Sequence, residues 1–246
     1  GNVADEFVLE WRDLALNAAE TNPFMEDWFA LPALLHLRDG SDVWQIEVRN
    51  DDGILIGLMH LSIHTGYGRM PVRFIGNWTH YQSFMGTPLV RKGCEIAFWH
   101  AATALLDTAD WAPNFLSLSG LECDGPVHQG LALAGRNPAV VHRHHRALLQ
   151  SDMAADAYLE LSLRGKKRKE LRRLANRLAD IGCVEFLILE SAEALDTWCA
   201  DFLALEAKGW KGESGAPLGK AEPTRAFFLD MMRGAFEAGR LEFQRL

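Results

Sequence analysis

Cationic side chains gather in the stretch 163–182, which reads LRGKKRKELRRLANRLADIG. Arginine and lysine at such density can bind phosphate or carboxylate groups. Apolar residues recur among them at steps of three and four, which predicts an amphipathic helix with one cationic face. Lys166–Lys169 lie in the first turn, where the positive end of the helix dipole disfavours cations, and a bound anion would offset that repulsion. A cationic face that is simply solvated explains the pattern equally well.

A second candidate site is the glycine-rich stretch 209–222, which reads GWKGESGAPLGKAE. Its glycines allow the backbone to turn sharply or to approach a ligand closely, and Lys211 and Lys220 can pair with a phosphate or a carboxylate. The spacing is not that of a Walker loop, and neither GxGxxG nor GxSxG occurs in the chain. A flexible connector between two helices is the alternative, although about 14 residues is long for one.

Histidines are the remaining candidates for acid–base or metal chemistry. His80 and Tyr81 lie together in the aromatic stretch 77–91, which we interpret as a loop that either contributes to a ligand pocket or packs as a cover. His142 and His144 would share one face of a strand, at a spacing that metal sites use. No carboxylate or cysteine lies near them in the sequence to complete a ligand set. We therefore interpret them as a polar strand face and expect no metal site.

The overall composition restricts the class of protein. The chain of 246 residues is 48% hydrophobic and carries a net charge of −8, as expected for a globular protein of one large or two ordinary domains. The acidity argues against general DNA or RNA binding. No apolar run is long enough to cross a bilayer, the amino-terminal residues do not resemble a signal peptide, and the four cysteines form no CxxC pair. We therefore expect reduced thiols and a cytoplasmic protein.

The elements that must position these groups alternate between strands and helices. Two strands, 43–49 and 54–63, read as a hairpin, and the second is apolar enough to be buried on both faces, with His60 and His64 on one of them. The early strands are linked by a hairpin while later ones alternate with helices, which predicts a mixed α/β fold with helices on both faces of the sheet. The other expected strands are 71–76, 115–121, 139–149, 183–190 and 240–246, and the other expected helices are 6–20, 92–108, 126–134 and 223–238.

Two helix boundaries can be read from their capping residues. Asn22 precedes Pro23, so the first helix should break there, and Asn22 should cap a second helix that has Pro23 in its first position. Ser191 should cap a later helix. The inner face of that later helix is expected to carry Leu195, Trp198, Cys199, Phe202 and Leu205.

The chain resembles the CelD-like, or cellulose-biosynthesis-type, acyltransferases of the GNAT superfamily, which are related to the FemABX aminoacyl transferases. The resemblance rests on an ordered set of segments, NPFMEDWF, ILIGLMHLSI, RFIGNWTHYQSFMGTPLV, KKRKELRRLANRLADIG and LEAKGWKGESGAPLG, and covers nearly the whole chain. It implies two tandem GNAT-like units, each a mixed sheet flanked by helices, at residues 1–155 and 156–246. The second unit is expected to be incomplete, because such proteins continue for roughly another hundred residues that include the cofactor-pyrophosphate site.

The resemblance further implies an enzyme, an N-acyltransferase that moves an acyl group from acyl-CoA or a related activated donor to an amine. No tightly bound cofactor is implied, since acyl-CoA acts as a co-substrate, and the acceptor would be a small-molecule or envelope-precursor amine. Glu206 is the candidate catalytic base, with a cap or ion pair at its helix end as the alternative. The candidate binding residues are Arg168, Arg172, Arg173, Trp210, Lys211 and Gly212, together with His80 and Tyr81 from the aromatic loop.

Two other functions remain open at this point. A non-catalytic module with the GNAT fold could use the basic helix to bind an acidic or phosphate-bearing partner. A tRNA contact through the same helix, which a tRNA-using relative would need, is the weaker alternative.

Overall fold

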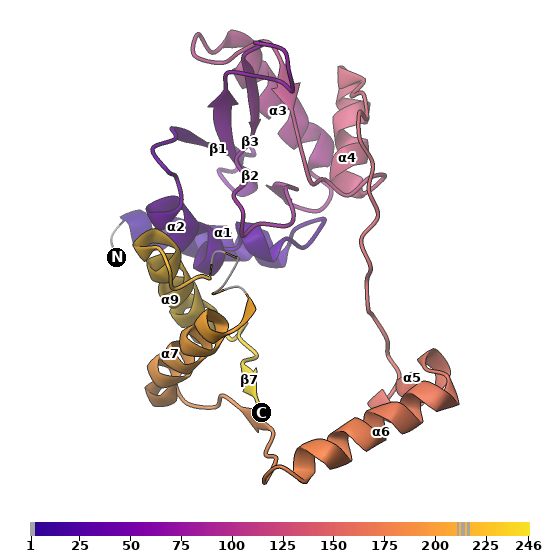
Figure 1. Ribbon diagram of the computed structural model, residues 1–246. Coiled ribbons are helices and arrows are strands. Elements are labelled where there is room, and N and C mark those ends of the chain that lie inside the picture. Colours follow the sequence, from indigo (N-terminus) through magenta and orange to yellow (C-terminus); the bar gives the residue numbers. More distant parts are fainter. Residues whose placement is uncertain (1–2, 211, 213–214, 216) are drawn as a thin grey trace. The chain divides into compact units, whose positions relative to one another are not determined.

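The computed structural model describes residues 3–210, 212, 215 and 217–246 of the chain (Figure 1). The chain divides into two compact units, and each is treated by itself. Unit 1 comprises Gly1–Val140 and Leu195–Leu241, and unit 2 comprises Val141–Ala194 and Glu242–Leu246. Helices and strands occur in both units, so the predicted mixed α/β class is confirmed.

Unit 1 is built on a mixed sheet. The strands β1 (Val43–Arg49), β2 (Leu55–His64), β3 (Phe74–Asn77) and β5 (Leu116–Ser117) lie in the order β1-β2-β3-β5, and the short β4 (Leu89–Val90) pairs with β2. Every pair in this sheet is antiparallel except β3 with β5, which is parallel. The strands predicted at 71–76 and 115–121 therefore form, but as the shorter β3 and β5.

The predicted hairpin between β1 and β2 is confirmed. In its turn, the side-chain oxygen of Asn50 accepts hydrogen bonds from the backbone N–H groups of Asp52 and Ile54, at 3.1 and 2.8 Å. Gly53 adopts a positive φ of 80°, which a residue without Cβ tolerates. The first eight residues of β2 are buried, so this strand is covered on both faces, as its sequence predicts.

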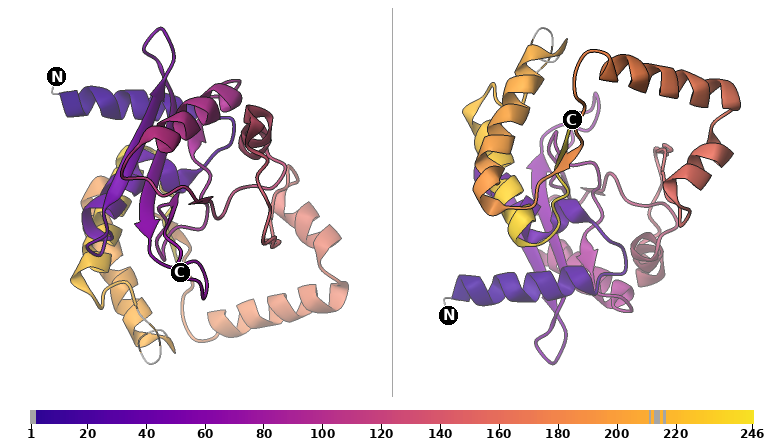
Figure 2. Two further views of the ribbon diagram at one scale, coloured as in Figure 1. Left: turned by 90° about the horizontal axis from the view of Figure 1, so that it is seen from above. Right: turned by 90° about the horizontal axis from the view of Figure 1, so that it is seen from below.

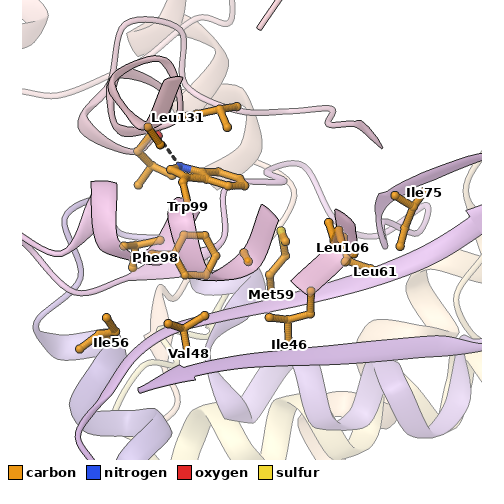
Figure 3. Close-up of a cluster of buried hydrophobic side chains, with 14 residues drawn as sticks. Ile46, Val48, Ile56, Met59, Leu61, Ile75, Phe98, Trp99, Leu106 and Leu131 are labelled. Carbon is orange, nitrogen blue, oxygen red and sulfur yellow. Dashed lines mark hydrogen bonds between the residues drawn. The ribbon is translucent and has the colours of Figure 1, made fainter. Parts of the chain in front are cut away.

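A large apolar cluster joins the sheet to the helices α3 (Glu95–Thr108) and α4 (Pro126–Leu131), and Figure 3 shows α3 lying over the strands. The indole Nε1–H of Trp99 donates to the backbone oxygen of Val127 at 2.8 Å. This bond satisfies a fully buried polar group and fixes the start of α4 against α3. Other members of the cluster are Ile46, Val48, Ile56, Met59, Leu61, Ile75, Phe98, Leu106 and Leu131.

A second cluster joins β2 to the amino-terminal helix α1 (Val3–Leu16). Trp11 and Leu14 are fully buried there, against Leu55 and Leu58 of the strand. Since β2 contributes side chains to both clusters, it is the element around which the helices of unit 1 assemble.

The predicted break at Asn22 is confirmed. Its side-chain oxygen accepts the backbone N–H of Phe24 at 3.0 Å, and Pro23 opens the short 3-10 helix η1 (Pro23–Met25). The helix α2 (Asp27–His36) follows. The amide of Asn22 also donates to the backbone oxygen of Thr87 at 2.6 Å, so the cap ties this segment to the residues before β4.

Two late helices complete unit 1. The helix α9 (Glu222–Glu237) packs on α2, where the ring centroids of Phe29 and Phe227 are 5.2 Å apart. The helix α7 (Ala192–Lys208) lies beside α9 (Figure 2). Leu195, Trp198 and Cys199 of α7 are buried, as predicted. Leu205 is not on an inner face, since it is 71% exposed.

Unit 2 contains α5 (Ala155–Ser162), α6 (Gly165–Ala179) and an antiparallel pair of short strands, β6 (Leu187–Ile188) and β7 (Gln244–Arg245). The helix α6 confirms the prediction for 163–182. The strand predicted at 139–149 is wrong, because these residues are exposed and without regular structure in the described chain. A strand needs a partner for its backbone groups, and in the described part of unit 2 only β6 and β7 find one.

The predicted boundary between residues 155 and 156 stays a prediction. By the contacts between residues, 195–241 belong to unit 1, because α9 packs on α2. None of the helices in the described chain combines the length and the apolar content that crossing a bilayer requires.

The contact of Gly57 with Phe98 gives a test of this packing. A Cβ at residue 57 would lie 2.0 Å from the Phe98 ring, so Gly57→Ala should overpack the joint between β2 and α3 and lower the free energy of unfolding by about 1–3 kcal/mol. Urea denaturation measures this change. Gly66→Ala is the control, since its Cβ would meet nothing closer than 3.7 Å and should change stability little. Equal stability of the two variants would contradict the packing.

Candidate functional site

The predicted site residues fall into three groups. One lies on α6 in unit 2, one at the carboxyl end of α7 in unit 1, and one in the loop 78–88 between β3 and β4, also in unit 1. Lys211 lies outside the described residues. In the same order, the groups are Arg168, Arg172 and Arg173; Glu206, Trp210 and Gly212; and His80 and Tyr81.

The loop 78–88 forms part of a small pocket in unit 1, with room for about one water molecule. Its walls come from η1, α2, β2, the end of β3 and the loop itself. The lining residues are Phe24, Met25, Ala30, Met59, His60, Asn77, Trp78, His80, Ser83, Met85, Gly86 and Pro88.

His80 belongs to this pocket. Its ring stacks on Phe29, with centroids 5.8 Å apart and planes 20° apart. Its Nδ1 accepts the backbone N–H of Gln82 at 3.3 Å, so the neutral ring carries its hydrogen on Nε2. Burial lowers the pKa of His80 to about 4, which keeps the imidazole neutral at pH 7. Tyr81 is 90% exposed and is not part of the described lining.

His60 is a second neutral histidine in the same pocket. Its Nε2 lies 3.0 Å from the side-chain oxygen of Gln45, its partner across the β1–β2 ladder. Burial lowers the pKa of His60 to about 4. His64, expected on the same face, leaves the core at the exposed end of β2 and stacks on Phe74 at 4.6 Å.

Asn77 holds the pocket loop in place. Its amide donates to the backbone oxygens of Gly86 and Ser119 at 2.9 and 2.8 Å, and its side-chain oxygen accepts the backbone N–H of Ser119 at 2.9 Å. A Cβ on Gly86 would lie 2.0 Å from the Ser119 oxygen, so only glycine allows this approach. The loop predicted at 77–91 is shorter in the structure, because Asn77 ends β3 and Leu89–Val90 form β4. The sequence did not single out Asn77 or Met85, because their role depends on contacts with distant segments.

Glu206 of α7 binds the backbone of the glycine-rich stretch at Leu218. Its Oε2 accepts the backbone N–H of Leu218 at 2.7 Å, and the hydroxyl of Thr224 donates to the Leu218 oxygen at 2.8 Å. A Cβ on Gly212 would lie 1.8 Å from the backbone oxygen of Ala207, so the glycine permits a close return of the chain onto α7. Trp210 is exposed. The described contacts of Glu206 thus match the structural alternative, an anchor at a helix end.

The three arginines of α6 differ in their surroundings. Arg168 donates from one guanidinium nitrogen to the backbone oxygens of Glu160 and Leu163, at 2.6 and 2.9 Å, and so closes the carboxyl end of α5. Arg172 and Arg173 are exposed, and neither makes an ion pair with the described part of the chain. Of the three arginines, Arg172 and Arg173 are therefore the ones that remain accessible to an anion.

The histidines at 142–145 form no ligand set. His142 and His144 are exposed, with ring centroids 5.9 Å apart. Within the described residues, no group of three or more His, Cys, Asp or Glu side chains has the geometry to hold a metal ion.

The depressed pKa of His60 makes stability depend on pH. The unfolded chain, with an imidazole pKa near 6.5, binds the proton before the folded chain does, so stability is full above pH 6.5 and is lost as the pH falls towards 4. Between pH 7.5 and 5 this site should remove about 2 kcal/mol from the free energy of unfolding. Urea titrations should show a shallower pH dependence for His60→Gln and an unchanged one for the exposed His142→Gln. An unchanged slope in His60→Gln would contradict the assignment.

Comparison with known proteins adds one match. Residues 165–246 match the family described as the acetyltransferase (GNAT) domain. The match spans the last third of the chain, from the first residue of α6 to Leu246, just after β7. Neither a curated protein nor a solved structure matches the chain. Over residues 165–246, the chain is therefore similar to GNAT acetyltransferase domains, which supports acyl transfer as its general class of activity.

Proposed function

We propose that the chain is an N-acyltransferase that transfers an acyl group from acyl-CoA, or a related activated donor, to an amine. The observation that carries the proposal is the match of residues 165–246 to the GNAT acetyltransferase domain. The narrower resemblance to CelD-like and FemABX proteins, with two tandem GNAT-like units, belongs to the same proposal. The acceptor would be a small-molecule or envelope-precursor amine.

The reaction needs no covalent intermediate with the protein. The amine nitrogen attacks the thioester carbonyl carbon, the C–S bond breaks as the C–N bond forms, and the proton lost by the amine is available to the leaving thiolate. Holding the two substrates in register and stabilising the oxyanion supply most of the acceleration. The side chains that we assign to these tasks are those that can hold the donor and the acceptor.

The donor is assigned to the cationic face of α6. Coenzyme A carries several phosphate charges, and guanidinium groups bind phosphate with paired N–H donors. Arg172 and Arg173 are exposed, whereas Arg168 already caps α5. Within this group, Arg172 and Arg173 are therefore the donor-binding candidates, and Arg168 supports the helix that carries them.

Isothermal titration with acetyl-CoA and with longer acyl-CoAs tests the donor. The chain, or a longer natural chain that contains it, should bind, and added salt should weaken the binding because phosphate contacts are screened. Arg172→Ala with Arg173→Ala should weaken it further. Arg69→Ala with Arg73→Ala removes two exposed arginines of unit 1 and should not. If no acyl-CoA binds to the longer chain, the proposal fails.

A matched pair of variants separates the two roles of Glu206. As an anchor, the residue needs only an acceptor oxygen for the Leu218 N–H, so Glu206→Gln should keep the stability of the chain and Glu206→Ala should lose about 1 kcal/mol. As the general base, the residue needs its carboxylate, so both variants should lose acyl transfer by about 10²–10⁴-fold. Transfer that survives in Glu206→Gln would remove the base assignment and leave the anchor.

A further inference from the structure

Glu20 carries a carboxyl group that is buried without a counter-charge. The residue lies between α1 and η1 in unit 1 and is 8% exposed. Its Oε1 accepts the backbone N–H of Val127, in α4, at 2.9 Å. Its Oε2 has no hydrogen-bond partner within the described residues, and none of the described cations pairs with either oxygen. Asp27 is buried to a similar degree but pairs with the guanidinium of Arg12 at 2.8 Å. Glu20 therefore lacks the partner that normally accompanies a buried carboxylate.

We infer that Glu20 takes up a proton in the folded chain, and that this proton holds the segment before η1 against the start of α4. A carboxylate that leaves water without gaining a counter-charge is strongly disfavoured, whereas the neutral acid loses far less. The neutral acid keeps Oε1 as the acceptor for the Val127 N–H and gains an O–H donor at Oε2. The hydroxyl of Thr87 lies beside this carboxyl, and its Oγ1 is also buried without a partner in the described chain. A proton on Oε2 therefore gives both oxygens a partner.

The backbone around Glu20 keeps the carboxyl in this place. The N–H of Ala19 donates to a backbone oxygen of β4 at 2.8 Å, and the side-chain amide of Asn22 donates to the backbone oxygen of Thr87 at 2.6 Å. From the side of α4, a Cβ on Gly125 would lie only 2.5 Å from Oε1 of Glu20. Because the chain is fixed on both sides of Glu20 and packed against its carboxyl, turning the group outward to water would break these contacts.

The surroundings of the carboxyl set the direction in which pH acts. Burial raises the pKa of Glu20 above its ordinary value of 4.5, against the opposing effect of the Val127 N–H. Glu122, in the segment before α4, is a like charge and raises this pKa further, while the Thr87 hydroxyl and His128 on α4 lower it by less. The folded chain thus holds the proton at pH values where the unfolded chain has released it. The contact is full below pH 4.5 and is lost as the pH rises through the folded-state pKa.

The proton itself is tested in the unmodified chain. The glutamate side chains are labelled with ¹³C, and the carboxyl carbon of Glu20 is followed by NMR between about pH 4 and pH 9. The signal is identified by its absence in Glu20→Gln. Its midpoint should lie above 4.5. A midpoint at or below 4.5 would overturn the inference.

Hydrogen exchange at Val127 tests what the proton does. The protection factor of this amide, which corrects for the pH dependence of chemical exchange, should fall as the pH rises past 4.5 and level off above the folded-state pKa. The total fall should be about tenfold for each unit by which the measured pKa exceeds 4.5. Two independent measurements must therefore agree, and protection that does not change with pH would contradict the role of the proton.

A matched pair of variants separates Glu20 from the other acidic groups. Glutamine has the shape of the neutral acid, since its carbonyl oxygen can accept the Val127 N–H and its NH₂ group can donate to Thr87. Glu20→Gln should therefore keep Val127 protected and remove the fall with pH. Glu6→Gln removes an exposed carboxylate of α1 and should keep the fall. A fall that persists in Glu20→Gln, or one that disappears in Glu6→Gln, would show that another group is responsible.

Discussion

Burial of both faces of β2 is the constraint on which the rest of unit 1 depends. The strand pairs with β1, β3 and β4, and its side chains enter the apolar clusters of α1 and of α3. Two residues of β2 show how strictly the packing fixes the register of the strand. Gly57 leaves room for the Phe98 ring, and His60 reaches the pocket while its Nε2 bonds to β1. A one-residue slip of the strand would move both residues to the wrong face, so packing and pocket share one register.

The pocket shows how a few polar groups position an otherwise apolar site. Asn77 uses its side chain to join the end of β3, Ser119 just beyond β5 and the pocket loop. Asn22 does the same between the amino-terminal segment and Thr87. Each of these hydrogen bonds goes to a backbone group, so they fix the path of the loop backbone. The side chains of the loop are therefore free to line the pocket. The pocket is therefore neutral and preformed.

In unit 2, the helix α6 has a half-exposed apolar stripe and a cationic face. The apolar stripe of α6 is between 42% and 46% exposed at Leu171, Leu174 and Leu178, and the opposite face is cationic. The GNAT match begins at Gly165, the first residue of this helix. The same helix therefore carries the densest group of cations in the sequence and is the first element of the region that is similar to GNAT domains. Its arginines have divided roles, because Arg168 is used within unit 2 while Arg172 and Arg173 face solvent.

The sequence by itself determined the elements whose causes are local. The hairpin of β1 and β2, the cap at Asn22, the helix α6 and the mixed α/β class follow from periodicity, turn residues and capping residues within a few positions of one another. Only the tertiary structure decided what depends on distant partners. The stretch 139–149 alternates like a strand yet finds no partner in the described chain, and Leu205 fits an apolar stripe yet remains exposed. Asn77, His60 and Met85 meet in one pocket because separate strands and a loop converge there, and periodicity along the chain carries no information about that convergence.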